Sequence, residues 1–417
     1  MELLNETEIK KVVKQWYCEK YDSLEYNIEN YSDEIVGHLG EHLSLKINVY
    51  CNNTCYKYSL FVKCIPRFDH FKAEYLRETK FFAKEFTLLN SLFTLFKEYE
   101  GNKKWRPKPV YLKEEVFVFE DVTQIGYTMR DPQTALSFED MVAAVEAAAR
   151  FHAQSFIFEH KKSKELKRPY SIWENYSVYL VEPTFLAWRD AGKHAVIDFL
   201  KTFSAYRNNP GFSELLADRI SLVFNRALDA MKPSNEFRNV VIHRDLWSNN
   251  IFFKRLESGK LHALIVDFQT ALYSTPTHDL TSMMYFNTSK EFRTLYSDEV
   301  QEYYYSFLQE SLACEHLSIG DYIPKEELGR LYEASTLFGI VQAALIVPIT
   351  HMSFNKIKEY CDTPEKNHKF NSISRSDCFI EFAKENVEYR NVVIALLDEI
   401  VERYVLVDQL NDDAERR

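Results

Sequence analysis

The sequence has no apolar run that approaches the roughly 20 residues of a membrane-spanning helix. Its longest apolar stretch, IVQAALIVPI at 340–349, is too short to span a bilayer and predicts a buried helix instead. The first residues, MELLNETEIKKVVKQW, contain no apolar stretch long enough for a signal peptide. We therefore expect a cytoplasmic protein with no membrane partner.

Cysteine is scarce, and its number is odd: seven residues without a framework of paired spacings. Cys51 and Cys55 are near neighbours, but no second pair follows at metal-ligand spacing, so a zinc site is not expected. Cysteines without such a framework are typical of proteins in a reducing compartment. This pattern agrees with a cytoplasmic location.

Positive charge is in deficit, with 51 Lys and Arg against 62 Asp and Glu and a net charge of -11. A general nucleic-acid binder needs an excess of cations for the phosphate backbone, so nucleic acid is not an expected partner. An anionic small substrate is still allowed, because a few local cations or a metal ion can reverse the field at a site.

The chain is long enough for two lobes, and its patterns change character near residue 122. Up to that point, alternating apolar residues predict strands, and the turn sequence CNNTC separates two of them. The predicted order is strand, strand, helix, strand, strand, after a first amphipathic helix. These elements are a helix over 6–20, strands over 43–51 and 56–65, a helix over 73–96, and strands over 108–112 and 115–121.

Most of the remainder predicts helices, beginning with SFEDMVAAVEAAARFHAQSFIF at 137–158, which Ser137 and early acidic residues open. The exception is 240–268, where two apolar strands bracket a polar motif. We expect an α+β, bilobal protein. A small β-rich lobe would span 1–122 and a larger, mostly helical lobe 123–417, and a cleft between such lobes is a common place for a ligand.

The polar motif lies in VVIHRDLWSNNIFF, residues 240–253. It places Asp245 at the end of one apolar strand and Asn250 five residues later, and a second apolar strand ends at Asp267. Phosphoryl transfer needs such groups: one carboxylate at the acceptor hydroxyl, and a carboxylate and an amide that hold Mg²⁺. A single Asp or Asn here would be interpreted as a turn cap. The whole pattern, H-x-D-x-x-x-x-N followed by D-F-Q, favours the functional interpretation.

The motif and its context resemble the ecdysteroid kinase-like family, which is related to choline kinases and aminoglycoside phosphotransferases within the protein kinase-like superfamily. Besides the motif with Trp247 and the later Val266-Asp267-Phe268-Gln269, other segments follow the order of that family. They are LFVKCIP (60–66), similar to its ATP-lysine strand, RETKFF (77–82), similar to its glutamate helix, VFVFEDV (116–122), similar to its inter-lobe hinge, and ARFHAQS (149–155), similar to a helix that follows.

The resemblance implies a protein kinase-like fold that uses ATP and Mg²⁺. Lys63 would contact the α- and β-phosphates, and Glu78 would hold Lys63 by an ion pair. The backbone of Glu120 and Val122 would bind adenine. Three further residues would carry the chemistry, and a fourth would be structural: Asp245 as the catalytic acid/base, Asn250 and Asp267 as the Mg²⁺ ligands, and His243 as a support of the catalytic loop.

Two other polar residues have structural interpretations from the sequence alone. His152 lies within a predicted helix, where a histidine is more often a hydrogen-bonded packing residue than a ligand. Asp279, in PTHDLTSMMY, is expected either to cap a helix or to brace the catalytic loop.

The sequence departs from the family pattern at two places. Arg244 stands where the family usually has glycine, and the candidate phosphate loop at 36–46 has Gly37 and Gly40 but no G-x-G-x-x-G. These departures keep open a second hypothesis, a pseudokinase or nucleotide- or ligand-binding protein without turnover.

A protein kinase is disfavoured, because the metal motif is DFQ rather than DFG and no A-P-E follows it. We expect instead a small-molecule kinase that phosphorylates a hydroxyl group of a small, partly apolar acceptor, such as an ecdysteroid or xenobiotic. The aromatic residues after 280 would suit the walls of its acceptor pocket, although most of them are expected in the core.

Overall fold

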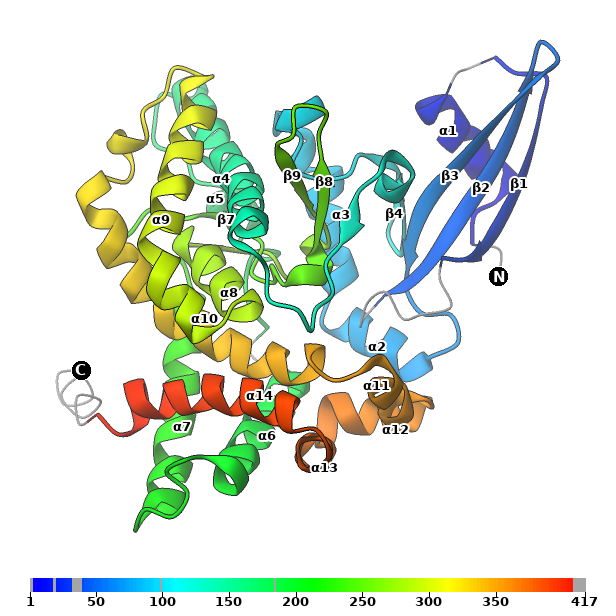
Figure 1. Cartoon of the computed structure of the whole chain (residues 1–417). Coiled ribbons are helices and arrows are strands. Elements are labelled where there is room, and N and C mark those ends of the chain that lie inside the picture. The colour runs from blue at the N-terminus through cyan, green and yellow to red at the C-terminus, as the bar shows by residue number, and fades with distance from the viewer. Residues whose placement is uncertain (1–2, 18–19, 32–39, 98–99, 184, 408–417) are drawn as a thin grey trace. The chain divides into compact units, whose positions relative to one another are not determined.

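The chain forms two compact units, each built from two separate segments. In the computed structural model, which describes residues 3–17, 20–31, 40–97, 100–183 and 185–407, one unit contains the main sheet and the other is mostly helical (Figure 1). The predicted α+β fold class is thereby confirmed.

The first unit consists of residues 1–129 and 249–270, and the second of residues 130–248 and 271–417. This division differs from the single boundary expected near residue 122, because the hairpin that follows the polar motif belongs to the first unit. The division of nucleotide binding and catalysis between two lobes stays a prediction.

The first unit is built on a five-stranded antiparallel sheet with the strand order β1-β2-β3-β5-β4. A smaller sheet, β6-β8-β9, contains the second segment of this unit. The elements are α1 (Glu6–Trp16), β1 (Ser23–Asn30), β2 (Glu41–Cys51), β3 (Thr54–Cys64), α2 (His70–Glu78), α3 (Phe81–Asn90), η1 (Leu92–Thr94), η2 (Gly101–Lys103), β4 (Pro109–Lys113), β5 (Val116–Glu120), η3 (Val122–Ile125), β6 (Thr128–Met129), η4 (Ser248–Asn250, at the junction with the other unit), β8 (Ile251–Arg255), β9 (Leu261–Ile265) and η5 (Phe268–Thr270).

Both hairpins predicted in the first unit are confirmed. In the β2–β3 hairpin, Asn52 and Asn53 both have positive φ, which suits a two-residue turn that follows the twist of the strands. Alternate residues of a strand point to the same side of a sheet. Because the apolar residues of these strands occupy alternate positions, one face of the sheet is apolar. That face and α1 form one hydrophobic cluster, with Ile9, Val12, Leu43, Leu45, Leu60, Val62 and Val118 among its buried members.

The sequence pattern failed in two places in this unit. Strand β1 was not predicted, because it is mostly exposed and lacks the apolar alternation of a half-buried strand. The single helix predicted over 73–96 is wrong. The chain forms α2 and α3 with a break at Lys80, which has the left-handed φ of 58°. The hydroxyl of Thr79 donates to the carbonyl of Tyr75 at 2.8 Å, and such bonds compete with continuation of a helix.

The second unit is helical apart from a two-stranded β7–β10 ladder. Helix α4 begins as predicted at Ser137, whose side chain forms a capping box with Asp140. The elements are α4 (Phe138–Leu166), α5 (Trp173–Tyr176), α6 (Ala187–Phe203), α7 (Phe212–Asp229), β7 (Val240–Ile242), β10 (Leu272–Ser274), α8 (Thr277–Asn287), α9 (Lys290–Ala313), η6 (Ile319–Asp321), η7 (Lys325–Glu327), α10 (Leu328–Thr350), α11 (Phe354–Cys361), α12 (Pro364–His368), η8 (Lys369–Ile373), α13 (Ser376–Glu385), α14 (Val387–Ile400) and η9 (Val401–Val405).

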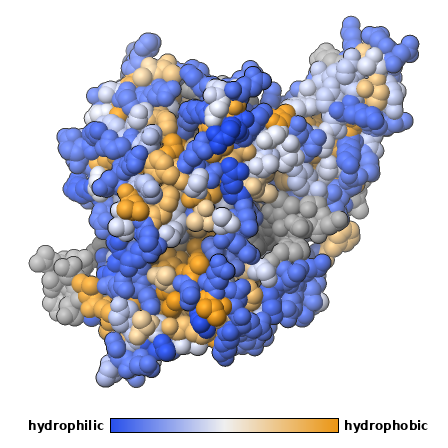
Figure 2. All heavy atoms as spheres, in the orientation of Figure 1, coloured by the Kyte–Doolittle hydropathy of each residue, from blue (hydrophilic) through white to orange (hydrophobic). Residues whose placement is uncertain are grey.

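Helix α10 contains the apolar stretch 340–349 and is a core helix, as predicted. The stretch Lys325–Thr350 is long and apolar enough to cross a membrane by length and composition, but 72% of its most apolar window is buried inside the protein. On the face of the protein shown in Figure 2, hydrophilic residues predominate and apolar ones form smaller patches.

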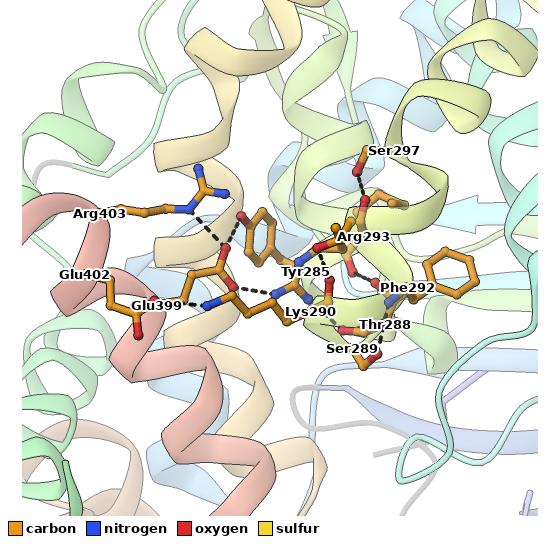
Figure 3. A network of polar contacts seen from close by, with 12 residues as sticks. Tyr285, Thr288, Ser289, Lys290, Phe292, Arg293, Ser297, Glu399, Glu402 and Arg403 are labelled. Carbon is orange, nitrogen blue, oxygen red and sulfur yellow. Dashed lines mark hydrogen bonds and ion pairs between the residues drawn. The ribbon is translucent and has the colours of Figure 1, made fainter. Parts of the chain in front are cut away.

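Every residue of α8 is buried, and a network of charged residues fixes the C-terminal end of this helix (Figure 3). The carboxylate of Glu399 in α14 accepts bonds from the Tyr285 hydroxyl at 2.8 Å and from the Arg293 guanidinium at 2.6 Å. Arg403 forms a further ion pair with Glu399 at 3.1 Å. Helices α8, α9 and α14 are thus tied to one buried carboxylate, and Tyr285 is a core residue rather than a wall of an open pocket.

The crossing of α8 and α10 gives a direct test of packing. A Cβ atom added at Gly339 in α10 would lie 2.6 Å from the backbone carbon of Thr281 in α8. Gly339→Ala should therefore push the helices apart and cost roughly 1–3 kcal/mol of unfolding free energy. Urea denaturation would measure this change.

Gly329, in the first turn of the same helix, provides the matched control, because a Cβ there would meet nothing within 4 Å. Gly329→Ala should be neutral or stabilising by up to about 1 kcal/mol. Equal effects of the two substitutions would show that the close crossing of α8 and α10 does not require glycine.

Candidate active site

A buried lysine lies at the centre of the charged residues in the first unit. Lys63, on β3, is 3% exposed, and its Nζ donates to Glu85 Oε2 at 2.6 Å and to Asp267 Oδ1 at 2.9 Å. Burial alone would lower the pKa of Lys63, but the two carboxylates hold its pKa above the ordinary value. The lysine is therefore a fixed positive charge.

The partner of Lys63 on the helix is Glu85, and the predicted ion pair with Glu78 is wrong. Glu78 is exposed at the last position of α2, whereas Glu85 is 1% exposed on α3, beyond the break at Lys80. The break changes which glutamate faces the sheet. The sequence does contain a signal for Glu85, because it lies three residues after Phe82 and four before Leu89, on the apolar side of α3.

Asp267 joins this cluster from the second segment of the unit. Its φ of 71° is left-handed, a conformation that is uncommon for a residue other than glycine. The next backbone N–H, that of Phe268, donates to Glu85 Oε1 at 3.1 Å, and the Phe268 ring packs edge-on against Phe93 and Trp105. Glu85 therefore binds both Lys63 and the backbone after Asp267. This strained geometry is typical of functional positions.

Asn250 lies next to Asp267 in this unit. Asn250 precedes β8 and Asp267 follows β9, and the register of this hairpin places the two residues at the same end. The N–H of Val266 donates to the Asn250 carbonyl at 3.0 Å. The second oxygen of Asp267 accepts from the Gln269 amide at 3.1 Å. A carboxylate and an amide are ligand types that Mg²⁺ prefers, and the role of these two residues as its ligands stays a prediction.

The predicted adenine-binding residues lie at the end of β5. The N–H of Glu120 donates to the Lys108 carbonyl at 3.0 Å, so this N–H already has an acceptor within the protein. Val122 is buried at the start of η3, and its carbonyl accepts from the N–H of Tyr127 at 3.1 Å. Their role in binding adenine stays a prediction. Gly37 of the candidate phosphate loop lies outside the described residues.

In the second unit, Asp279 braces the loop that carries Asp245. Its carboxylate accepts from the N–H of His243 at 2.7 Å and from that of Arg244 at 2.6 Å. His152 Nε2 also bonds this carboxylate at 2.9 Å, while its Nδ1 bonds the Tyr304 hydroxyl. His152 is therefore a buried packing histidine, as expected, and Asp279 holds the loop.

Asp245 itself is half-buried, and its N–H donates to Nδ1 of His243 at 3.2 Å. This bond agrees with the predicted supporting role of His243. Because Asp279 fixes the two residues before Asp245, the carboxylate of Asp245 extends from a backbone that is already held in place. The backbone that carries Asp245 is therefore fixed, and the acid/base role of this residue stays a prediction.

Arg244, the departure from the family's glycine, has a φ of 76°, which is the backbone conformation that glycine adopts most easily. Its guanidinium forms a two-pronged ion pair with Glu182, at 2.5 and 3.1 Å, and Glu182 also pairs with Arg189 at 3.0 Å. The ion pairs anchor a residue whose backbone conformation is unfavourable. Nothing in the sequence pattern pointed to Glu182, since it lies far from the motif and outside any periodic element.

The sheet with its buried lysine and the braced H-x-D loop together define a protein of the kinase-like class. Within that class, the chain belongs to the ecdysteroid kinase-like family, which matches residues 40–317. The resemblance inferred from the motifs is thereby confirmed. A search among curated proteins finds no match.

Solved structures with some similarity to this chain are themselves kinases and phosphotransferases. An ethanolamine kinase from Plasmodium vivax is 14% identical with a TM-score of 0.42, over 93% of this chain and 91% of that one. An aminoglycoside 2'-phosphotransferase in complex with GDP is 14% identical with a TM-score of 0.36, over 94% and 96%. A choline kinase from Streptococcus pneumoniae is 12% identical with a TM-score of 0.33, over 79% and 98%.

The corrected ion pair can be tested by truncating each glutamate. Glu85→Ala removes one of the two counter-ions of a buried ammonium and the acceptor of the Phe268 N–H, so we expect a loss of roughly 3 kcal/mol of unfolding free energy. Glu78→Ala, at an exposed position, should change it by less than about 0.5 kcal/mol. Urea unfolding of both variants measures the difference, and a larger loss for Glu78→Ala would restore the original assignment.

The brace of the loop should be visible in the pH dependence of stability. Burial alone would raise the pKa of Asp279, but bonds from His152 and the His243 N–H hold it below the ordinary value of 3.8. A lowered folded-state pKa gives stability that is present above pH 3.8 and is lost as the pH falls below it. Asp279→Asn should destabilise the protein most near pH 7, and the difference from wild type should shrink below about pH 4.

Unfolding by urea at pH 7, 5, 4 and 3 measures this difference. Asp218→Asn, at an exposed position on α7, is the control and should behave like wild type throughout. A destabilisation by Asp279→Asn that stays constant from pH 7 to 3 would contradict a charged carboxylate as the brace.

Proposed function

We propose that this protein is a small-molecule kinase that transfers the γ-phosphoryl group of ATP to a hydroxyl group of a small, partly apolar acceptor. As the acceptor we favour an ecdysteroid or a xenobiotic, on the ground of the family to which the chain belongs. The observation that carries the proposal is the buried Lys63 ammonium, held between Glu85 and Asp267. A buried charge of this kind is costly, and perturbed buried charges with specific partners are typical of functional sites.

Each residue of the proposed site has a separate role. When bound, Mg·ATP supplies the transferable phosphoryl group and the metal charge that stabilises its oxygens. Lys63 would bind the α- and β-phosphates, and Asn250 and Asp267 would hold the ion. Asp245 orients the acceptor hydroxyl and accepts its proton, so that the oxygen attacks phosphorus while the bond to ADP breaks.

Substitution of the acidic residues separates binding from catalysis. Asp245→Asn should lower kcat by a factor of about 10²–10⁴, because it removes the acid/base group, while leaving the affinity for Mg·ATP nearly unchanged. Asp267→Ala should instead abolish the rise in Tm that Mg·ATP causes in the wild type. Asp218→Asn serves again as the exposed control.

The measurements are a thermal-shift titration with ATP and Mg²⁺, and mass spectrometry of acceptors after incubation with ATP. The acceptor panel contains 20-hydroxyecdysone, choline, ethanolamine and an aminoglycoside. Full activity of Asp245→Asn would show that the roles are wrongly assigned. Binding of Mg·ATP without phosphorylation of any acceptor would favour the second hypothesis, a binding protein without turnover. Phosphorylated protein in place of a phosphorylated small molecule would overturn the proposal.

A further inference from the structure

A histidine lies directly opposite Lys63 in the sheet of the first unit. In the β2–β3 ladder, His42 pairs with Lys63, while the adjacent pair Leu43 and Val62 is buried in the cluster with α1. Residues directly opposite each other in an antiparallel pair point to the same face, and successive residues alternate. His42 and Lys63 therefore share the face of the sheet that lies away from α1.

The side chain of His42 faces the same charged groups as Lys63. Its ring lies 5.1 Å from that of Phe61, which precedes Lys63 by two residues on the same face. The charges that act on His42 come from Lys63, Asp267, Lys72 and Glu41. Burial, and next the positive charge of Lys63, lower the pKa of His42 to about 4, so that the imidazole is neutral at physiological pH.

A neutral imidazole keeps one N–H donor. Within the described part of the chain, no hydrogen bond engages either ring nitrogen of His42, and part of the residue is exposed to solvent. The backbone leading to His42 also crosses Lys63 closely, since a Cβ at Gly40 would lie 3.2 Å from Lys63 Cγ and 3.3 Å from Cε. The backbone of β2 therefore holds the ring N–H of His42 close to the side chain of Lys63.

The proposed nucleotide needs more donors than Lys63 can give. An ammonium group has three N–H donors, and two of those on Lys63 already bind Glu85 and Asp267. In many kinase-like proteins glycine-rich backbone surrounds the phosphates, but this sequence has no G-x-G-x-x-G. His42 lies opposite Lys63 and could supply a second hydrogen-bond donor to the phosphates. The positive charge of Lys72, on α2, also acts at this position.

We infer that His42 is a nucleotide-binding residue whose ring N–H donates a hydrogen bond to a phosphate oxygen beyond the α-phosphate. The inference rests on the proposed function, since it assigns one further contact to the same nucleotide site. It makes His42 a determinant of affinity for di- and triphosphates, and it gives β2 a direct part in binding.

Two substitutions of similar size separate the donor from the packing of the ring. His42→Phe keeps a ring against Phe61 but removes the N–H, whereas His42→Gln keeps an N–H donor without the ring. His42→Phe should weaken the binding of Mg·ATP and Mg·ADP about tenfold, as expected for one bond to a charged group. His42→Gln should remain within about threefold of wild type.

The probes are adenosine, ADP and ATP, and binding is measured by calorimetry and thermal shift on the full chain. Neither substitution should change the affinity for adenosine, which has no phosphate. His70→Ala, an exposed histidine on α2 of the same unit, is the matched control and should bind all three probes like wild type.

The binding results distinguish a hydrogen bond from His42 to phosphate from a packing role of its ring. Equal binding of ATP by wild type and His42→Phe would overturn the inference while leaving the proposed function intact. An equal loss of affinity for adenosine and ATP would overturn it as well, because His42 would then act through packing. If the wild type binds none of the probes, the proposed function fails and the inference with it.

Discussion

The ammonium group of Lys63 is the interaction on which the first unit depends. Its counter-ions come from two segments that are far apart in the chain, Glu85 on α3 and Asp267 after β9. Glu85 also binds the backbone after Asp267, so one helix fixes both the lysine and the loop. A buried ion pair contributes little net stability when it is compared with apolar packing. Its presence here is better explained by the fixed positive charge that it supplies.

The two halves of the motif are built by the same physical means. Arg244 and Asp267 each adopt a left-handed backbone conformation. The N–H of Arg244 itself donates to the buried carboxylate of Asp279. The N–H that follows Asp267, that of Phe268, donates to the buried carboxylate of Glu85. A conformation that costs of order 1 kcal/mol or more persists when the surroundings determine it completely. Here the two carboxylates hold these backbone conformations in place. Asp279 lies on α8, and the other end of this helix is fixed by the hydrogen bond from Tyr285 to Glu399.

Much of this arrangement could be predicted from the sequence. The hairpins, the capped start of α4 and the motif residues followed from alternation, capping and spacing, which are local signals. The choice of Glu85 over Glu78 was missed, although Glu85 lies on the apolar side of α3, because neither glycine nor proline marks the helix break at Lys80. Glu182 was missed for another reason. Its partner Arg244 is about sixty positions away in the chain, and only the folded structure brings them together.

The split of the first unit into residues 1–129 and 249–270 also has a consequence for biosynthesis. A chain leaves the ribosome from its N-terminus, and domains generally fold as units as they emerge. The sheet of this protein is complete early, yet Lys63 has one of its two counter-ions until Asp267 has been translated, after the whole stretch 130–248. A fragment that ends after β6 would permanently lack Asp267, and one hydrogen bond of the buried Lys63 ammonium would then have no acceptor. The smallest sensible expression fragment for the first unit is therefore longer than the sheet alone suggests.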